Sequence, residues 1–275
     1  MQQIHYPIYM SDKRFSVVIP TVGRHDRFLP KLISDLRNEN NLIGEIIVVR
    51  SGLNSKFSLV YRVFFDTLKL ILRPGFDVQV LTFSSKQTAG QNRNTGWETA
   101  RFEFTAFLDA DDLYHQKRLT TINELLHLHP NANLILNLYS FSNLKTTYTP
   151  LKDDEIVSDD SIHTSISEAF EKESSNWEVP GLYNLAAVGK SGESLKIAHG
   201  NATVRSNLRD SIQYSSIPKG EDGLFASEVL VKQGQVFIIL RELAFYRNFN
   251  SSFAPNFFKK KLIRTRDNFY IIFRK

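Results

Sequence analysis

Residues 102–119 read FEFTAFLDADDLYHQKRL, and the remaining sequence is best understood around this stretch. Its apolar run at residues 104–108 is typical of a short strand buried on both faces. Three carboxylates follow at Asp109, Asp111 and Asp112, before a polar segment that favours a helix. Open α/β sheets bind their ligands outside the carboxyl ends of buried strands. The stretch therefore predicts a ligand site at a strand tip.

The acidic turn has two interpretations. In the first, Asp109 and Asp111 come round one divalent cation, since Mg²⁺ and Mn²⁺ are bound through one or two carboxylates together with substrate phosphates. In the second, the acids only form a turn that caps a helix near Leu113, a position that Asp favours for its local hydrogen bonds. The acidic residues alone do not decide between these interpretations, so the flanking sequence has to.

Composition excludes several classes of protein. Hydrophobic residues make up 42% and charged residues 23% of the 275, which is ordinary for a globular chain. No stretch approaches the roughly 20 apolar residues of a membrane-spanning helix, and the N-terminal extension, residues 1–13, lacks the apolar core of a signal peptide. The chain has no cysteine, which fits a reducing compartment, so we expect a cytoplasmic protein. The net charge of +5 favours anionic partners without choosing among nucleotides, nucleic acid and membrane surfaces.

Strands and helices are predicted to alternate in the first part of the chain. An apolar face of Leu29, Leu32, Ile33 and Leu36 predicts a helix that begins near Asp26, which we expect to cap it. Buried strands are predicted at residues 14–20, 45–49 and 78–83, and a helix at 56–72. This alternation indicates a parallel sheet with helical crossovers.

The second part of the chain is less regular. We expect a helix over 115–128 and a strand over 133–141, followed by a polar loop over 143–176 that contains a short helix within 162–170. Next come a strand, a glycine turn and a strand over 194–205, a helix from about 221 to 232, and separate strands at 236–240 and 243–247. The tail over 251–275 is basic and aromatic, so it forms either a helix on a membrane surface or a segment packed on the domain.

A second polar motif, TAGQNRNTGW at residues 88–97, opens the helix before the central strand. Gly90 and Gly96 permit close backbone approach, the helix N-terminus offers free amides to an anion, and Arg93 suits a phosphate. The alternative is an ordinary helix with a surface arginine.

Four pieces in this order, SVVIPTVGR, EIIVV, QNRNTGWETA and FLDADD, resemble the GT-A glycosyltransferases of the family 2 type. The resemblance implies one α/β domain over 14–250, with a Rossmann-like mixed sheet flanked by helices. It assigns residues 14–114 to a nucleotide-sugar half and 115–250 to an acceptor half. It also implies a nucleotide-sugar donor held through Mn²⁺ or Mg²⁺.

The resemblance carries over to particular residues. It makes Asp111 and Asp109 the metal ligands, and it places His199, Gly200 and Asn201 on the acceptor side, although a lone histidine is more often structural than a ligand. The expected donor-binding residues are Pro20, Thr21, Arg24, Arg50, Arg93, Asn94, Asp109 and Ala110.

A later motif, KGEDGLF at residues 219–225, resembles the Glu-Asp signature of inverting members, whose Asp is the catalytic base. Transfer of a sugar to an alcohol needs a carboxylate to take the hydroxyl proton. The positive end of a helix dipole would favour the ionised form of Asp222. We therefore expect Asp222 to act as base with Glu221 in support, and a glycan, a lipid or a protein to supply the acceptor hydroxyl.

Two departures from the family pattern leave questions open. Many members carry Asp-Asp-Gly-Ser after the second strand, where an Asp reads the donor base, whereas this chain has RSGL at residues 50–53. Phe249 occupies the place where many members supply a histidine, so the third protein ligand of the metal is unassigned.

Two other functions compete with this assignment. A nucleotidyltransferase would share the sheet and the metal, but the chain has no glycine-rich phosphate loop. A non-catalytic basic protein that binds nucleic acid or membrane would not need Asp109, Asp111 or Asp222. We expect no nucleic-acid partner, and the basic tail leaves peripheral association with a membrane open.

Overall fold

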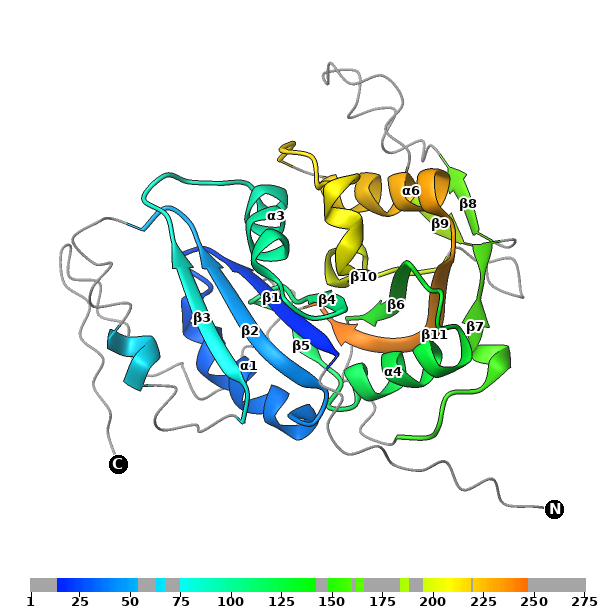
Figure 1. Ribbon diagram of the computed structural model, residues 1–275, viewed down its shortest axis with the longest axis horizontal. Helices are drawn as coiled ribbons and strands as arrows, with labels where there is room; N and C mark the ends of the chain where they lie inside the picture. The colour runs from blue at the N-terminus through cyan, green and yellow to red at the C-terminus, as the bar shows by residue number, and fades with distance from the viewer. Residues whose placement is uncertain are drawn as a thin grey trace.

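A mixed β-sheet of nine strands runs through the protein (Figure 1). The computed structural model describes residues 14–53, 63–67, 75–141, 148–159, 162–165, 184–187, 195–218 and 220–246. The strand order is β3-β2-β1-β4-β10-β6-β11-β5, with β7 paired to β11. The strands are β1 Phe15–Thr21, β2 Ile43–Arg50, β3 Asp77–Thr82, β4 Phe104–Phe107, β5 Leu113–Tyr114, β6 Leu134–Ser140, β7 Ile156–Val157, β10 Thr203–Arg205 and β11 Val236–Phe245. A separate hairpin pairs β8 (Ile162–Ser165) with β9 (Asn184–Ala187).

The predicted parallel unit is confirmed in β1 to β4. Strand β1 pairs in parallel with β2 and with β4, and β2 pairs in parallel with β3. Because β2 and β3 lie on one side of β1 and β4 on the other, the chain reverses direction across the sheet between β1 and β4. A crevice at such a switch point is where doubly wound sheets bind ligands. The acidic turn follows β4 at this switch point.

Helices cover both faces of the sheet (Figure 1). On one face, α1 (Leu29–Leu36) and α4 (Arg118–Leu128) pack against Phe15, Val17 and Ile19 of β1. On the other face, α3 (Ala89–Thr99) and α6 (Glu221–Gln233) contribute Trp97 and Phe225 to a second cluster. Alternate residues of a strand point to opposite faces, so an uninterrupted apolar run such as β1 serves both clusters. The predicted class, an α/β domain with a mixed sheet flanked by helices, is confirmed.

The prediction for α1 was right in its buried face and wrong in its cap. Leu29, Leu32, Ile33 and Leu36 are all buried, as expected. Neither α1 nor the 3₁₀ turn before it, Asp26–Phe28, has a side-chain cap. Asp26 instead accepts hydrogen bonds from Thr21 Oγ1 at 3.0 Å and Arg50 Nε at 2.8 Å. The buried guanidinium of Arg50 requires a counter-charge, and that requirement outweighs a local cap.

Tertiary pairing overrode three local predictions in the second part of the chain. The two strands expected at 236–240 and 243–247 are one strand, β11, whose register against β6 shifts between Ile239 and Glu242 and again before Ala244. Such bulges accommodate a polar interruption without ending a strand. Residues 162–165 form β8 rather than the start of a helix, because they pair with β9. Residues 113–114 form β5 against β11, so α4 begins at Arg118 instead of 115.

Several predicted segments lie partly or wholly outside the described residues. Of the helix expected at 56–72, only 63–67 are described, and they are helical. The stretch at 194–205 contains β10 and a short 3₁₀ helix, η5 (His199–Asn201), where a first strand was expected. The tail over 251–275 and the extension over 1–13 are not described. No helix in the described part of the chain is both long and apolar enough to cross a bilayer.

Packing of α3 on the sheet gives a prediction for stability. A Cβ added at Gly96 would lie 2.3 Å from Cγ1 of Val18 in β1. We expect Gly96→Ala to lower the free energy of unfolding by about 1–3 kcal/mol through overpacking, as measured by urea denaturation. Glu98→Ala, an exposed change on the same helix, is the control and should stay within about 0.5 kcal/mol of the parent protein. A Gly96→Ala protein as stable as the parent would contradict this close packing.

Candidate active site

Acidic side chains from distant parts of the sequence face one point beside Gly200. A Cβ placed on this glycine would lie 2.7 Å from Asp109 Oδ2, 3.1 Å from Arg93 Nη2 and 3.4 Å from Asp222 Oδ2. Asp109 follows β4, Asp222 lies in the first turn of α6, and Gly200 belongs to η5. The structure therefore brings the predicted metal-binding turn and the predicted base together, with Gly200 close to both.

Arg93 joins the two acidic elements. Its side chain is only 3% exposed, with Nη2 2.7 Å from Asp109 Oδ1 and Nη1 2.8 Å from Glu221 Oε1. The guanidinium carbon lies 5.4 Å from the ring centroid of Tyr214. Burial alone would lower the pKa of Arg93, but the surrounding acids raise it, so the side chain stays charged. Arg93, expected at a donor phosphate, is thus paired with carboxylates in this ligand-free arrangement.

Asp109 lies in an environment that disfavours its charged form. Burial raises its pKa to about 6, and Asp111 and Asp222 push in the same direction against the lowering effect of Arg93. The side chain is 28% exposed, so solvent can deliver the proton. Negative charge is therefore concentrated at the strand tip beyond what Arg93 compensates, and a cation would relieve it.

Asp222 is held at the start of α6. The N-cap of this helix is Gly220, whose φ of 77° belongs to the left-handed region that glycine adopts without strain. Asp222 Oδ1 accepts a hydrogen bond from the backbone N–H of Gly223 at 2.8 Å. The bond fixes the orientation of this carboxyl group at the N-terminal end of the helix. Asp222 is thus a suitable proton acceptor, while neighbouring Glu221 is paired with Arg93.

The turn after β1 contributes a residue that sequence reasoning missed. His25 Nε2 lies 3.4 Å from Asp111 Oδ2 and accepts a hydrogen bond from Arg24 Nε at 2.8 Å. Burial lowers the pKa of His25, although Asp111 acts in the opposite direction. The signal in the sequence was the position of this histidine in the TVGRHD turn beside the expected donor residues.

Asn201, expected on the acceptor side, organises the acidic turn. It is fully buried, and its Oδ1 accepts hydrogen bonds from the Asp109 backbone N–H at 3.1 Å and the Tyr114 hydroxyl at 2.9 Å. Its Nδ2 donates to Asp112 Oδ2 at 3.4 Å. Asp112 is thus held by a buried amide, unlike Asp109 and Asp111, the predicted metal ligands.

Other expected donor and acceptor residues have more varied surroundings. The Asn94 side chain binds the backbone of Tyr214 through both of its polar atoms, at 2.8 Å each. Pro20 and Ala110 are buried beside the crevice, and half-buried His199 opens η5 just before Gly200.

Aromatic rings lie near the acidic side chains. Tyr139 and Tyr246 stack with centroids 4.2 Å apart, and Phe141, which is 58% exposed, packs edge-on against Tyr139 at 5.2 Å. Burial raises the pKa of Tyr246, and the charges of Asp109, Asp112 and Asp222 raise it further. These rings therefore provide an apolar wall close to the carboxylates.

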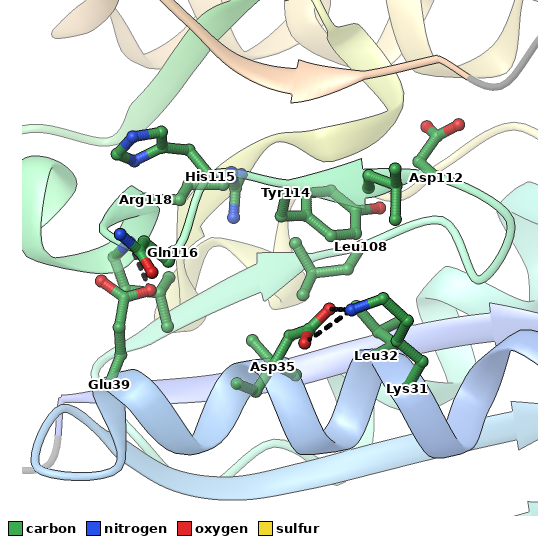
Figure 2. Close-up of a pocket in the computed structure, with 13 residues that line it drawn as sticks. Lys31, Leu32, Asp35, Glu39, Leu108, Asp112, Tyr114, His115, Gln116 and Arg118 are labelled. Atoms are coloured by element: carbon green, nitrogen blue, oxygen red, sulfur yellow. Dashed lines mark hydrogen bonds and ion pairs between the residues drawn. The ribbon is translucent and has the colours of Figure 1, made fainter. Parts of the chain in front are cut away.

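A small cavity has Leu108 and Asp112 in its wall (Figure 2). Its volume is about 20 Å³, room for about one water molecule, and it lies between α1 and the β5–α4 segment. Lys31 and Asp35 form an ion pair in its wall, and Arg118 lines it with a buried Nη1 that has no hydrogen-bond partner. The cavity suits a bound water.

The residues around the acidic turn form part of a divalent-cation site. Among the described residues, no three histidine, cysteine or acidic side chains gather closely enough to form a complete site. Mg²⁺ is usually bound by one or two carboxylates, with substrate phosphates and water completing the shell. Asp111 with its neighbour His25, and Asp109 with its unrelieved charge, fit such a partial site.

The pKa of Asp109 gives a prediction for stability against pH. A carboxyl whose pKa rises from 3.8 when unfolded to about 6 when folded binds more protons in the native state between those values. Stability contributed by this group therefore falls as pH rises from about 4 to about 6. We expect Asp109→Asn, melted with a chelator present, to gain in Tm relative to the parent between pH 4.5 and 7.5. Asp210→Asn, an exposed control, should show no such trend. If the difference in Tm between Asp109→Asn and the parent does not change with pH, the raised pKa of Asp109 is contradicted.

The position of Gly200 beside Asp109 and Asp222 gives a prediction for ligand binding. The backbone at this glycine is not in the left-handed region, so Gly200→Ala should fold, but its methyl group would lie among the carboxylates. We expect this variant to lose most of the thermal stabilisation that Mn²⁺ with a nucleotide gives the parent protein. Asn207→Ala, an exposed change nearby, should retain it. A Gly200→Ala protein with full ligand stabilisation would show that the site lies elsewhere.

Comparison with solved structures shows the same fold. S. aureus TarS 1–349 in complex with UDP-GlcNAc has a TM-score of 0.56 at 15% identity, over 86% of this chain and 59% of that one. Glucosyl-3-phosphoglycerate synthase from Mycobacterium tuberculosis, in complex with Mn²⁺, UDP and glucosyl-3-phosphoglycerate, has a TM-score of 0.53 at 13% identity, over 86% of this chain and 73% of that one.

Sequence comparison gives the family. An uncharacterized glycosyltransferase of Haemophilus influenzae is 25% identical over 120 residues, which is 44% of this chain and 37% of that relative. The chain thus spans well under half the length of this curated relative. The sequence model of glycosyl transferase family 2 matches residues 16–190, more than half of the chain. The protein therefore belongs to glycosyl transferase family 2 and has the GT-A fold of its structural neighbours.

Proposed function

We propose that this glycosyltransferase is metal-dependent and inverting, and that it moves a sugar from a nucleotide-sugar donor to an acceptor hydroxyl. The observation that carries the proposal is the meeting of Asp109 and Asp222 beside Gly200. One carboxylate follows the strand at the switch point of the sheet, and the other begins a helix. A donor diphosphate with its cation and an acceptor hydroxyl need two such acids on either side of the transferred sugar.

The donor half of the site is assigned to the crevice between β1 and β4. Thr21 and Arg24 lie in the turn after β1, and Arg50 ends β2 directly beside Thr21 in the sheet register. Asp111 and Asp109 would hold Mn²⁺ or Mg²⁺, and the bound cation supplies Lewis-acid stabilisation of the leaving diphosphate. Pro20 and Ala110 lie beside this crevice, and Asn94 supports it through its hydrogen bonds to the Tyr214 backbone. Arg93 keeps the strand tip and α6 at a fixed separation.

Asp222 is assigned as the general base. The acceptor oxygen forms a bond to the anomeric carbon while the bond from that carbon to the diphosphate oxygen breaks. The hydroxyl proton passes to the Asp222 carboxylate in the same step. Displacement from the side opposite the leaving group inverts the configuration at the anomeric carbon. Glu221 supports the base indirectly, because its ion pair with Arg93 fixes the first turn of α6.

The molecules bound in the structural neighbours support this class of donor. TarS was solved with UDP-GlcNAc, and the mycobacterial synthase with UDP and with Mn²⁺ or Mg²⁺. At 13–15% identity these structures support a nucleotide sugar and a divalent cation without naming the sugar or base used by this chain. For the acceptor, Tyr139, Phe141 and Tyr246 favour a group with an apolar face, which a glycan, a lipid or a protein can each present. Peripheral association of the basic tail with a membrane stays a prediction.

Donor binding is tested by a thermal-shift panel of nucleoside diphosphates and nucleotide sugars with Mn²⁺ or Mg²⁺. A ligand that binds only the native state stabilises it by mass action and so raises Tm. At a concentration of 100 times its Kd, it raises the free energy of unfolding by about 2.7 kcal/mol. We expect at least one nucleotide sugar to raise Tm only when the cation is present, and Asp111→Asn to lose that dependence. A shift from nucleoside triphosphates alone would favour a nucleotidyltransferase instead.

Catalysis is tested with the donor that the panel identifies, by following release of the nucleoside diphosphate. Asp222→Asn should keep the cation-dependent shift and lose at least about 100-fold in rate, the usual contribution of a general base. Asp210→Asn, an exposed aspartate outside the site, is the matched control and should retain full rate. Near-normal turnover in Asp222→Asn would remove the assignment of the base.

A further inference from the structure

We propose that His25 is a protein ligand of the divalent cation, together with Asp111. The inference deepens the proposed function and rests on it. Two side chains from different turns lie close together: His25 Nε2 is 3.4 Å from Asp111 Oδ2. His25 lies in the turn after β1, and Asp111 in the turn after β4, so the ion would bind at the switch point itself.

The separation suits two ligands of one ion. Ligands about 2.1 Å from an ion, in the octahedral geometry that Mg²⁺ demands, lie about 3 Å apart when adjacent. The observed 3.4 Å requires only a small closure. His25 and Asp111 are also partly accessible, with side chains 14% and 25% exposed, so an ion and its waters can reach them. Mg²⁺ or Mn²⁺ would fill its remaining positions from the diphosphate and water.

The imidazole is in the form that binds metals. His25 Nε2 accepts a hydrogen bond from Arg24 Nε, so this nitrogen carries a lone pair rather than a proton. Neutral imidazole is the ligand form of histidine. The lone pair points at a positively charged group and lies beside a carboxylate, which is the arrangement that a cation requires.

Arg24 currently stands in for the cation. Its guanidinium occupies the position next to His25 Nε2, 2.8 Å away, that a metal ion would take. When ion and donor bind, Arg24 gives up this bond and turns to the donor diphosphate, where sequence analysis places it. The exchange raises the positive charge beside Asp111, because a divalent ion replaces a monovalent guanidinium, and the added charge faces the donor diphosphate. His25 thereby fills the place of the unassigned third ligand, for which His199 was the weak candidate.

A nitrogen ligand makes the inference measurable without any substrate. Oxygen ligands suit both Mg²⁺ and Mn²⁺, so a single imidazole nitrogen among them is a distinct feature that spectroscopy of Mn²⁺ can detect. We expect His25→Gln to weaken Mn²⁺ binding at least about tenfold, the lower end of what disturbed metal sites lose, with a smaller loss for Mg²⁺. His127→Gln, an exposed histidine on α4, is the matched control and should bind Mn²⁺ like the parent.

The deciding measurement is electron spin echo spectroscopy of Mn²⁺ bound to the full chain, alone and with inorganic pyrophosphate, which contains no nitrogen. We expect an imidazole ¹⁴N modulation in the parent protein, its loss in His25→Gln, and its replacement by a ¹⁵N coupling when the parent is labelled with ¹⁵N-histidine. The labelled parent shows whether any histidine binds the ion even if a variant fails to fold, and the absence of a ¹⁵N coupling there overturns the inference. Asp111→Asn should lose the bound ion.

The outcomes separate the two proposals. If Mn²⁺ binds, depends on Asp111 and shows no nitrogen coupling, His25 is not a ligand and the proposed function stands. If a nitrogen coupling persists unchanged in His25→Gln, another histidine is the ligand and the inference is overturned. If the parent chain binds no Mn²⁺ with or without pyrophosphate, both the inference and the metal dependence of the proposed function fail.

Discussion

The buried guanidinium of Arg93 is the interaction on which the site depends. It binds Asp109 from the first half of the chain and Glu221 from the second, at 2.7 and 2.8 Å, with 3% of its side chain exposed. A buried charge that loses one partner is costly, so the three groups hold one another in place. The distance between the strand tip after β4 and the first turn of α6 follows from this pairing. Because Asp222 directly follows Glu221, the candidate base is fixed by the same contact.

The four residues DADD show how identical side chains take different roles. Asp109 pairs with Arg93, Asp111 approaches His25, and Asp112 accepts a hydrogen bond from buried Asn201. Each partner comes from a different element, namely α3, the turn after β1, and η5. The division of roles is therefore a property of the tertiary structure. No spacing rule within the acidic turn would have revealed it.

The sequence was most informative where local pattern and tertiary environment agree. The apolar runs of β1, β2 and β4 and the inner face of α1 were predicted correctly, because strands buried on both faces and a helix with one apolar stripe leave a direct signature. The predictions failed where pairing between distant segments decides the outcome. Strand β11 continues, with bulges, through polar residues that locally predict the end of a strand. Asp26 accepts a hydrogen bond from Arg50 rather than capping the helix that follows it. Candidate site residues were recognised by type, whereas their partners were not.

Electrostatics explains why such a site is built from paired groups rather than free ones. Burial raises the pKa of Asp109, and repulsion from Asp111 and Asp222 acts in the same direction, against the contact with Arg93. In the ligand-free chain this repulsion is moderated by cations that belong to the protein, Arg93 at the centre and Arg24 at the edge. Arg93 is buried between two acids and cannot leave without exposing both, whereas Arg24 is an exposed residue whose bond to His25 is local. Of the two, only Arg24 can exchange with an incoming ion at little cost. The site thus combines a permanent cation that fixes its geometry with a replaceable one that keeps the ligand position ready.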